Sequence, residues 1–152
     1  MIDVMGTTTK TLYDTDFVEW TAHVAGMLRQ GCIDEADLEH IADEIEDLGK
    51  SERSAVRSHL HRMLMHLIKQ KIQPEKSGSS WRRSIAEGRA EVEFKLEDSP
   101  SLRRYAEQNL ERIWRKAVKN ALFETGHAGR EKDLDIPANC PYTLDDILDG
   151  DL

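Results

Sequence analysis

Apolar residues recur every three to four positions along most of this chain, and this spacing is typical of helices that bury one face. A first helix is predicted near residues 16–30, with a stripe of Phe17, Trp20, Val24, Met27 and Leu28. A second begins at Asp34 and carries Leu38, Ile41, Ala42, Ile45 and Leu48 on one face. A third carries Val56, Leu60, Met63, Leu64, Leu67 and Ile68.

Short polar residues, glycines and a proline mark the expected ends of these helices. Asp16 and Glu19 form a capping-box pattern, and Gly31 is placed to end the first helix as its C-cap. Gly49 either stops or bends the second helix, and Ser51 can cap the third. Pro74 closes the third helix, because proline cannot donate a backbone hydrogen bond.

The second half of the chain continues the pattern. A fourth helix starts near Ser79 or Ser80 and is predicted to bury Trp81, Ile85, Val92 and Leu96. Gly88 lies on the same stripe and allows a close helix–helix approach, at a cost of up to ~1 kcal/mol in propensity. A fifth helix is predicted over residues 101–125, followed by a loop at 127–141. The sequence TLDD (143–146) caps a short last helix.

No stretch of the sequence alternates between apolar and polar residues as a strand does. The prediction is therefore an all-α, antiparallel helical bundle of about five main helices plus a short C-terminal helix. The length of 152 residues fits a single helical domain over residues 1–152. Within it, residues 1–12 are expected to be flexible, and residues 127–152 to form a loop and a C-terminal arm.

The net charge of −8 conceals a strong segregation of charge along the chain. Residues 1–49 carry two basic and twelve acidic side chains, whereas residues 50–83 carry nine basic and two acidic ones. The favoured interpretation is that the basic helix lies beside the acidic N-terminal helix and the two fields cancel. The alternative is a basic face for nucleic acid, although net acidity weakens affinity for phosphates. Its candidates are Arg53, Arg57, Arg62, Lys69, Lys71, Arg82 and Arg83.

The sequence also suggests where in the cell the protein is located. No window of 18 residues is apolar throughout, so no membrane-spanning helix and no membrane partner are expected. The N-terminus lacks the basic and apolar regions of a signal peptide. Cys32 and Cys140 form no metal-binding or redox pair, and two lone cysteines are expected to stay reduced. A cytoplasmic protein is the resulting expectation.

Three histidines, His59, His61 and His66, fall within eight residues of the third helix. On a helical wheel His61 lies on the opposite flank from the other two, and no pair has the three- or four-residue spacing of a helical metal site. The sequence contains no glycine-rich phosphate loop, no GxSxG motif and no Cys–His nucleophile spacing. No metal, cofactor or catalytic residue is therefore predicted.

A polar line nevertheless runs beside the apolar stripe of the third helix at seven-residue spacing. It consists of Glu52, His59, His66 and Gln73. It is either a solvated flank or a seam facing the second helix, where Asp37 and Glu44 flank the apolar stripe in the same way. A Glu44–His66 hydrogen bond near Trp81 could then form a site for a small polar ligand or a metal. The candidate ligand-binding residues are Glu44, Glu52, His66, Gln73 and Trp81.

Seven short stretches, in order and spacing, extend over nearly the whole chain: 13–31, 38–52, 64–75 (LMHLIKQKIQPE), 79–85 (SSWRRSI), 98–102 (DSPSL), 124–126 and 140–143 (CPYT). Together they resemble domain-of-unknown-function family 29. The resemblance implies a bacterial, all-helical protein whose activity is not established. Among the matching positions are Glu52, His66 and Gln73, three members of the polar line, whereas Lys71 stands where tryptophan is common in the family.

The function expected from the sequence is a non-enzymatic helical module that acts through protein–protein contact. Its predicted partner is a second copy of itself, in a homodimer, or another protein. Two alternatives stay open: a small-molecule or metal-dependent hydrolase-type site at the candidate ligand-binding residues, and nucleic-acid binding through residues 50–83.

Overall fold

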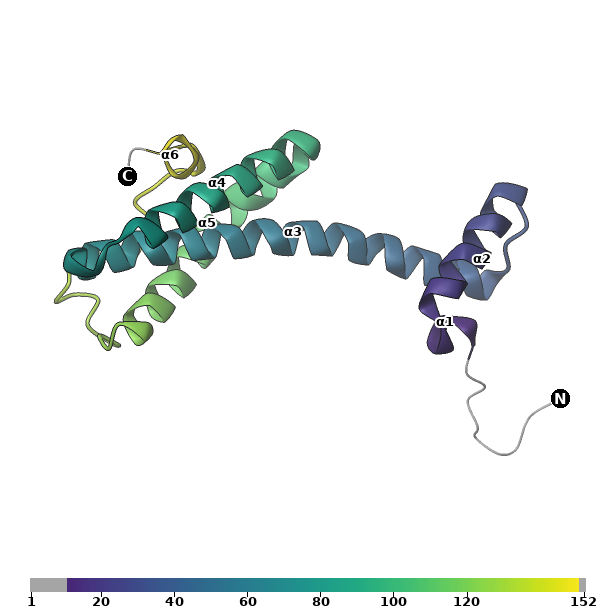
Figure 1. Ribbon diagram of the computed structural model, residues 1–152, viewed down its shortest axis with the longest axis horizontal. Coiled ribbons are helices and arrows are strands. Elements are labelled where there is room, and N and C mark those ends of the chain that lie inside the picture. The colour runs from purple at the N-terminus through teal and green to yellow at the C-terminus, as the bar shows by residue number, and fades with distance from the viewer. Residues whose placement is uncertain (1–10, 151–152) are drawn as a thin grey trace, which may run out of the picture. The chain divides into compact units, whose positions relative to one another are not determined.

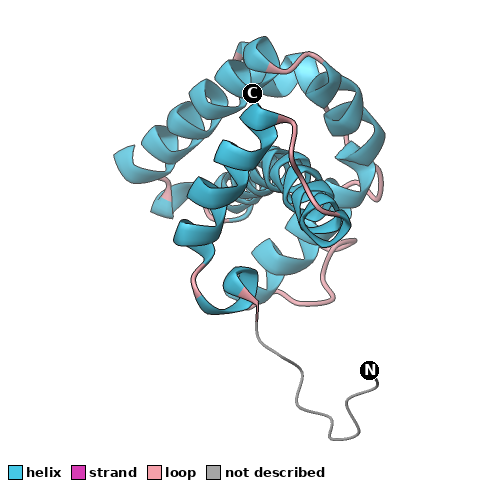
Figure 2. Cartoon of the chain, turned by 90° about the vertical axis from the view of Figure 1, so that its right-hand side faces the viewer, coloured by secondary structure: helices cyan, strands magenta, loops and turns pink. Residues whose placement is uncertain are grey.

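The computed structural model describes residues 11–150, and within this range every regular element is a helix (Figures 1 and 2). The predicted all-α fold is thus confirmed. The helices are α1 (Leu12–Thr15), α2 (Phe17–Gln30), α3 (Glu35–Ile72), the 3-10 helix η1 (Pro74–Lys76), α4 (Ser79–Asp98), α5 (Ser101–Glu124) and α6 (Leu144–Asp149). The flexibility predicted for the N-terminus falls largely on residues 1–10, which lie outside the described residues.

The predicted helix ends agree well with the structure, except at Gly49. Asp16 caps α2 by accepting a hydrogen bond from the Glu19 backbone, and Gly31 ends it in the left-handed conformation at φ 68°. By contrast, α3 continues through Gly49 for 38 residues, so of the two alternatives left open at Gly49 the helix stop, with its cap at Ser51, is excluded. One glycine costs about 1 kcal/mol in a helix, which the strong helix formers around it offset. The ribbon of α3 is uninterrupted in Figure 1.

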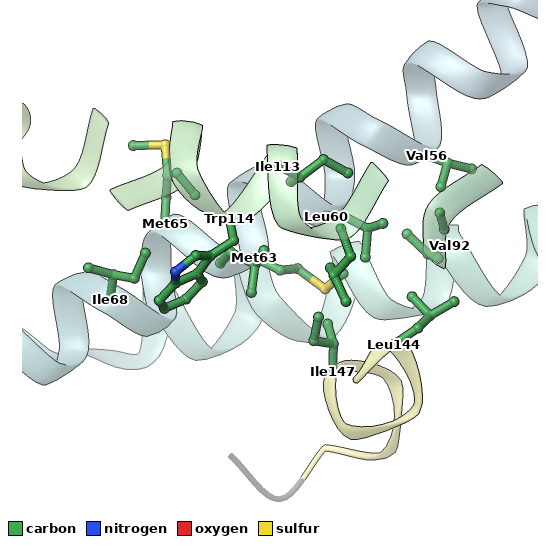
Figure 3. Packing of buried hydrophobic residues seen from close by; sticks show 14 of the residues in the cluster. Val56, Leu60, Met63, Met65, Ile68, Val92, Ile113, Trp114, Leu144 and Ile147 are labelled. Atoms are coloured by element: carbon green, nitrogen blue, oxygen red, sulfur yellow. The ribbon is translucent and has the colours of Figure 1, made fainter. Parts of the chain in front are cut away.

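The chain divides into two compact units, residues 1–49 and residues 50–152, here named the N-terminal and C-terminal units. The single domain predicted from length stays a prediction. In the C-terminal unit α3, α4, α5 and α6 share one apolar core. Figure 3 shows Leu60 and Met63 of α3 packed with Val92 of α4 and with Leu144 and Ile147 of α6.

Gly88 provides the close approach of α4 to α3 that its position predicts. A Cβ atom built on Gly88 would lie 2.8 Å from Cγ of Met63, which is fully buried. Any side chain at this position would therefore displace Met63. Trp81, near the start of α4, is half-buried rather than buried.

The C-terminal arm is held against the core of the C-terminal unit. Thr143 and Asp146 form the predicted capping box of α6, and Arg89 donates to the Ile147 carbonyl at 2.7 Å. In the preceding loop, the Trp114 indole donates to the Pro137 carbonyl at 3.0 Å. Burial raises the pKa of the Cys140 thiol, which keeps it protonated and suits a packing role better than a nucleophilic one.

The N-terminal unit has little core of its own. In its described part only Trp20 and Val24 are buried among the apolar side chains. Much of both predicted stripes is exposed instead, as in Phe17, Leu28, Leu38, Ile45 and Leu48. Amphipathic periodicity thus located the apolar faces correctly, but it did not reveal that these faces lack cover within the unit.

Candidate functional site

In the C-terminal unit a groove of about 620 Å³ lies between α3 and α5 and is here named the basic groove. Its volume falls within the range of small-molecule sites, roughly 300–1,000 Å³. It is lined by Arg57, Ser58, His61, Arg62, Met65, His66, Lys69, Arg112, Ile113, Lys116 and Glu124.

Positive charge dominates the basic groove. Five of its side chains are permanent cations, and Glu124 is its one carboxylate. Lys69 is paired with Glu124. Across residues 11–150, the structure gives Arg62, Arg112 and Lys116 no carboxylate partner within salt-bridge distance. The cations therefore repel one another in a recess where water screens them less than on an open surface.

Helical periodicity explains why these side chains converge. On α3, Arg57, His61 and Met65 follow one another at four-residue spacing, as do Ser58 and Arg62 on the adjacent row. On α5, Arg112 and Lys116 are also four residues apart. Sequence reasoning missed these last two residues. Their spacing in ERIWRKAV was a usable signal, but only the packing of α5 beside α3 brings them to the basic groove.

Both groove histidines favour the neutral form. Burial, followed by the charge of Lys116, lowers the pKa of His61 below its ordinary value. Burial, followed by the charges of Lys69 and Arg62, does the same for His66. On the helical wheel of α3, His61 and His66 lie on opposite flanks of the apolar stripe. Both still line the basic groove, because the groove extends over the side of α3 that faces away from that stripe.

The two rings differ in how they are held. His61 Nε2 lies 3.1 Å from the side-chain amide nitrogen of Asn120 on α5. His66 Nδ1 is buried without a hydrogen-bond partner, and in the described structure no hydrogen bond to the His66 ring fixes its orientation. Its neighbour is the Trp81 ring, 6.0 Å away between centroids. A buried polar atom without a partner is uncommon in folded proteins and calls for an explanation, such as a bound water molecule or ion.

The polar line faces α4, not the segment at residues 34–48. Glu52 pairs with Lys95 of α4 at 2.7 Å, and His66 lies beside Trp81 of α4. Gln73 sits at the N-cap of η1 without a side-chain capping bond. The predicted neighbour of the line is therefore wrong, because residues 34–48 belong to the same continuous helix as the line itself.

Glu44 has a different partner. The Tyr13 hydroxyl donates to Glu44 Oε1 at 2.6 Å, and this hydrogen bond raises the pKa of Tyr13 to about 12. The Trp20 indole likewise donates to Asp37 Oδ1 at 3.0 Å, and the Tyr13 ring stacks on His40 at 3.9 Å. Glu44 and His66 both belong to the continuous helix α3. The prediction that they come from two neighbouring helices is thus wrong.

Three of the seven candidates for a basic face line the basic groove, and the basic face as a whole stays a prediction. Arg57, Arg62 and Lys69 line the basic groove, whereas Lys71 donates to the Asp135 carbonyl at 3.0 Å. The other three, Arg53, Arg82 and Arg83, do not line it. No group of three or more metal-ligating side chains converges anywhere in residues 11–150.

Among the described helices, none combines the length and the apolarity needed to cross a bilayer. No curated protein and no solved structure matches the chain. One family model does match, over residues 12–152: the chain belongs to the family described as Domain of unknown function DUF29.

Proposed function

We propose that this protein is a homodimeric interaction module, and that its N-terminal unit supplies the dimer contact. The observation that carries the proposal is an apolar stripe on α3, here named the apolar face and formed by Leu38, Ile41, Ile45 and Leu48, of which all but the half-buried Ile41 are exposed. Ile45 is 63% exposed and Leu48 is 69% exposed. Such side chains, placed together on one helix, are typical of a surface that another protein covers.

The spacing of the apolar face supports a second copy as the partner. Its four residues follow at intervals of three, four and three, which is the a/d repeat of a helix that pairs with another helix. A seam of this kind is complementary to itself, and two-fold homodimers are the commonest soluble oligomers. The short seam on each copy would therefore meet the same seam on the other.

Charge is compatible with self-association at this face. Asp37 and Glu44, which flank the apolar stripe, already accept hydrogen bonds from Trp20 and Tyr13. On a helical wheel the remaining acidic residues of this segment, among them Glu39, Asp43 and Glu46, lie on the opposite side of α3. Two apolar faces can thus meet without bringing the two acidic ridges together.

Light scattering coupled to size-exclusion chromatography tests the proposal. We expect the full chain to elute with the mass of two copies, and Ile45→Glu to elute with the mass of one. The expectation rests on the cost of burying an unpaired charge in an apolar contact. The matched control is Phe123→Glu, which places the same charge at an apolar side chain that is 77% exposed in the C-terminal unit.

The outcomes separate cleanly. A dimer that Ile45→Glu dissociates and Phe123→Glu leaves intact supports the apolar face as the contact. A single-chain mass for the unmodified protein throughout the micromolar range, or a dimer insensitive to Ile45→Glu, contradicts the proposal.

A further inference from the structure

We propose that the basic groove binds a small phosphate-bearing molecule. This inference does not depend on the dimer, because the basic groove uses residues of the C-terminal unit only, whereas the apolar face belongs to the N-terminal unit.

The unpaired cations of the basic groove call for an anion. Arg62, Arg112 and Lys116 line one recess from two helices without a carboxylate partner in the described chain. Unpaired surface cations usually spread apart into solvent, whereas these converge on one volume. A guanidinium presents a planar fork of donors that matches phosphate oxygens in pairs, and lysine adds a point charge.

The histidines suit the same ligand. His61 and His66 line the basic groove in their neutral form, and a neutral imidazole still offers one N–H donor to a phosphate oxygen. Because no hydrogen bond fixes the His66 ring, that ring can turn toward a ligand without breaking a hydrogen bond. An anion in the basic groove would also favour protonation of both rings, which gives the experiment a direct readout.

The floor of the basic groove is apolar, but it offers little surface to a ligand. Met65 and Ile113 line the recess among the charged groups. Met65 is 9% exposed and Ile113 is 3% exposed, since both belong to the buried core. The charged rim of the basic groove, and not its floor, is therefore what recognises the ligand.

The arrangement favours a small molecule over a nucleic acid. A nucleic-acid surface tracks many phosphates along a stripe and is generally basic overall. Here the net charge is −8, and Arg53, Arg82 and Arg83 lie outside the basic groove. The cations thus surround one recess of about 620 Å³ instead of extending along a strand.

Calorimetry and NMR with two probes, inorganic phosphate and phenyl phosphate, test the proposal on the full chain at low salt in a phosphate-free buffer. We expect both probes to bind, because each presents phosphate oxygens to the arginine and lysine side chains of the basic groove. The ring signals of His61 and His66 should move on binding, while those of His23, which is exposed in the N-terminal unit, should not.

Charge-removing variants complete the experiment. Arg62→Gln and Arg112→Gln should each weaken phenyl phosphate binding about tenfold, the effect of losing one charge-assisted hydrogen-bonding partner. The matched control is Arg82→Gln, which removes the same charge from an exposed position outside the basic groove and should bind like the unmodified protein. All of these residues are exposed, so the variants are expected to fold.

Three results would overturn the proposal. One is no binding of either probe at millimolar concentration. Another is equal weakening by Arg82→Gln and Arg62→Gln, which would indicate a general charge effect. The last is a single-stranded oligonucleotide that binds more tightly than phenyl phosphate and depends on Arg82 as much as on Arg62, which would assign the surface to nucleic acid. The mass measurement on Ile45→Glu is independent of each of these results.

Discussion

The two units of this protein are built from the same kind of amphipathic helix, yet they use it differently. In the C-terminal unit the apolar faces of α3, α4, α5 and α6 meet in one core. In the described part of the N-terminal unit only Trp20 and Val24 are buried, and Tyr13 and Trp20 donate hydrogen bonds to α3. A segment of about 40 residues rarely buries enough surface to be stable alone. The comparison shows that the same helical pattern gives a shared core in one unit and largely exposed apolar side chains in the other.

The sharpest test of this contrast is a large-to-small substitution in each unit. Leu60 is fully buried between helices of the C-terminal unit, so Leu60→Ala should lower the free energy of unfolding by about 3 kcal/mol. Val18 is 76% exposed in the N-terminal unit, so Val18→Ala should change the free energy of unfolding by less than about 0.5 kcal/mol. Urea unfolding followed by circular dichroism measures both. Similar losses for the two variants would contradict the contrast.

A smaller effect, but one of opposite sign in the two units, is expected for glycine-to-alanine changes within helices. Gly88→Ala should destabilise the C-terminal unit by about 1–3 kcal/mol, because its Cβ would overlap Met63. Gly26→Ala meets no atom within 4 Å in the N-terminal unit, so it should stabilise α2 by up to about 1 kcal/mol through helix propensity. Thermal unfolding of the two variants measures whether each substitution raises or lowers stability. A stabilising Gly88→Ala would show that Met63 moves aside without cost.

Local signals predicted the elements better than the sites. Side-chain caps at Asp16 and Thr143 and the glycine at 31 act on a few neighbouring residues, so the sequence alone placed those helix ends. Local signals do not decide the outcome at Gly49, since a glycine can stop a helix or lie within one. Here the preference of its neighbours for helix outweighs the cost of the glycine, and α3 continues.

The basic groove needed tertiary information. Arg57, Arg62 and Lys69 stood out as a basic run, but Arg112 and Lys116 are more than forty residues away in sequence and meet them only because α5 packs beside α3. For the same reason, the polar line was recognised from its spacing and assigned to the wrong neighbour. Periodicity identifies a face of a helix, and only the packing tells what lies opposite.

Mild acid should weaken the C-terminal unit more than the N-terminal unit. The pKa values of His61 and His66 are lowered in the folded protein, so each contributes stability above its ordinary pKa of 6.5 and loses it as the pH falls below that value. Since both side chains are partly exposed, the effect is smaller than that of a core substitution. We expect the melting temperature to fall between pH 7.5 and pH 5, and His61→Gln to reduce that fall. If His61→Gln leaves the pH dependence of the melting temperature unchanged, His61 does not contribute to it.

The smallest effect is expected in alkali, and it concerns the N-terminal unit. The hydrogen bond to Glu44 raises the pKa of Tyr13 to about 12 from 10.0, so the neutral phenol is favoured in the folded state. The stability that this hydrogen bond contributes is complete below pH 10 and is lost as the pH rises toward 12. Titration of tyrosinate absorbance should show a late step that disappears in Tyr13→Phe and shifts to lower pH in Glu44→Gln. If Glu44→Gln leaves that step in place, the contact between α1 and α3 does not hold the N-terminal unit together. The apolar face would then have to stabilise that unit through its partner alone.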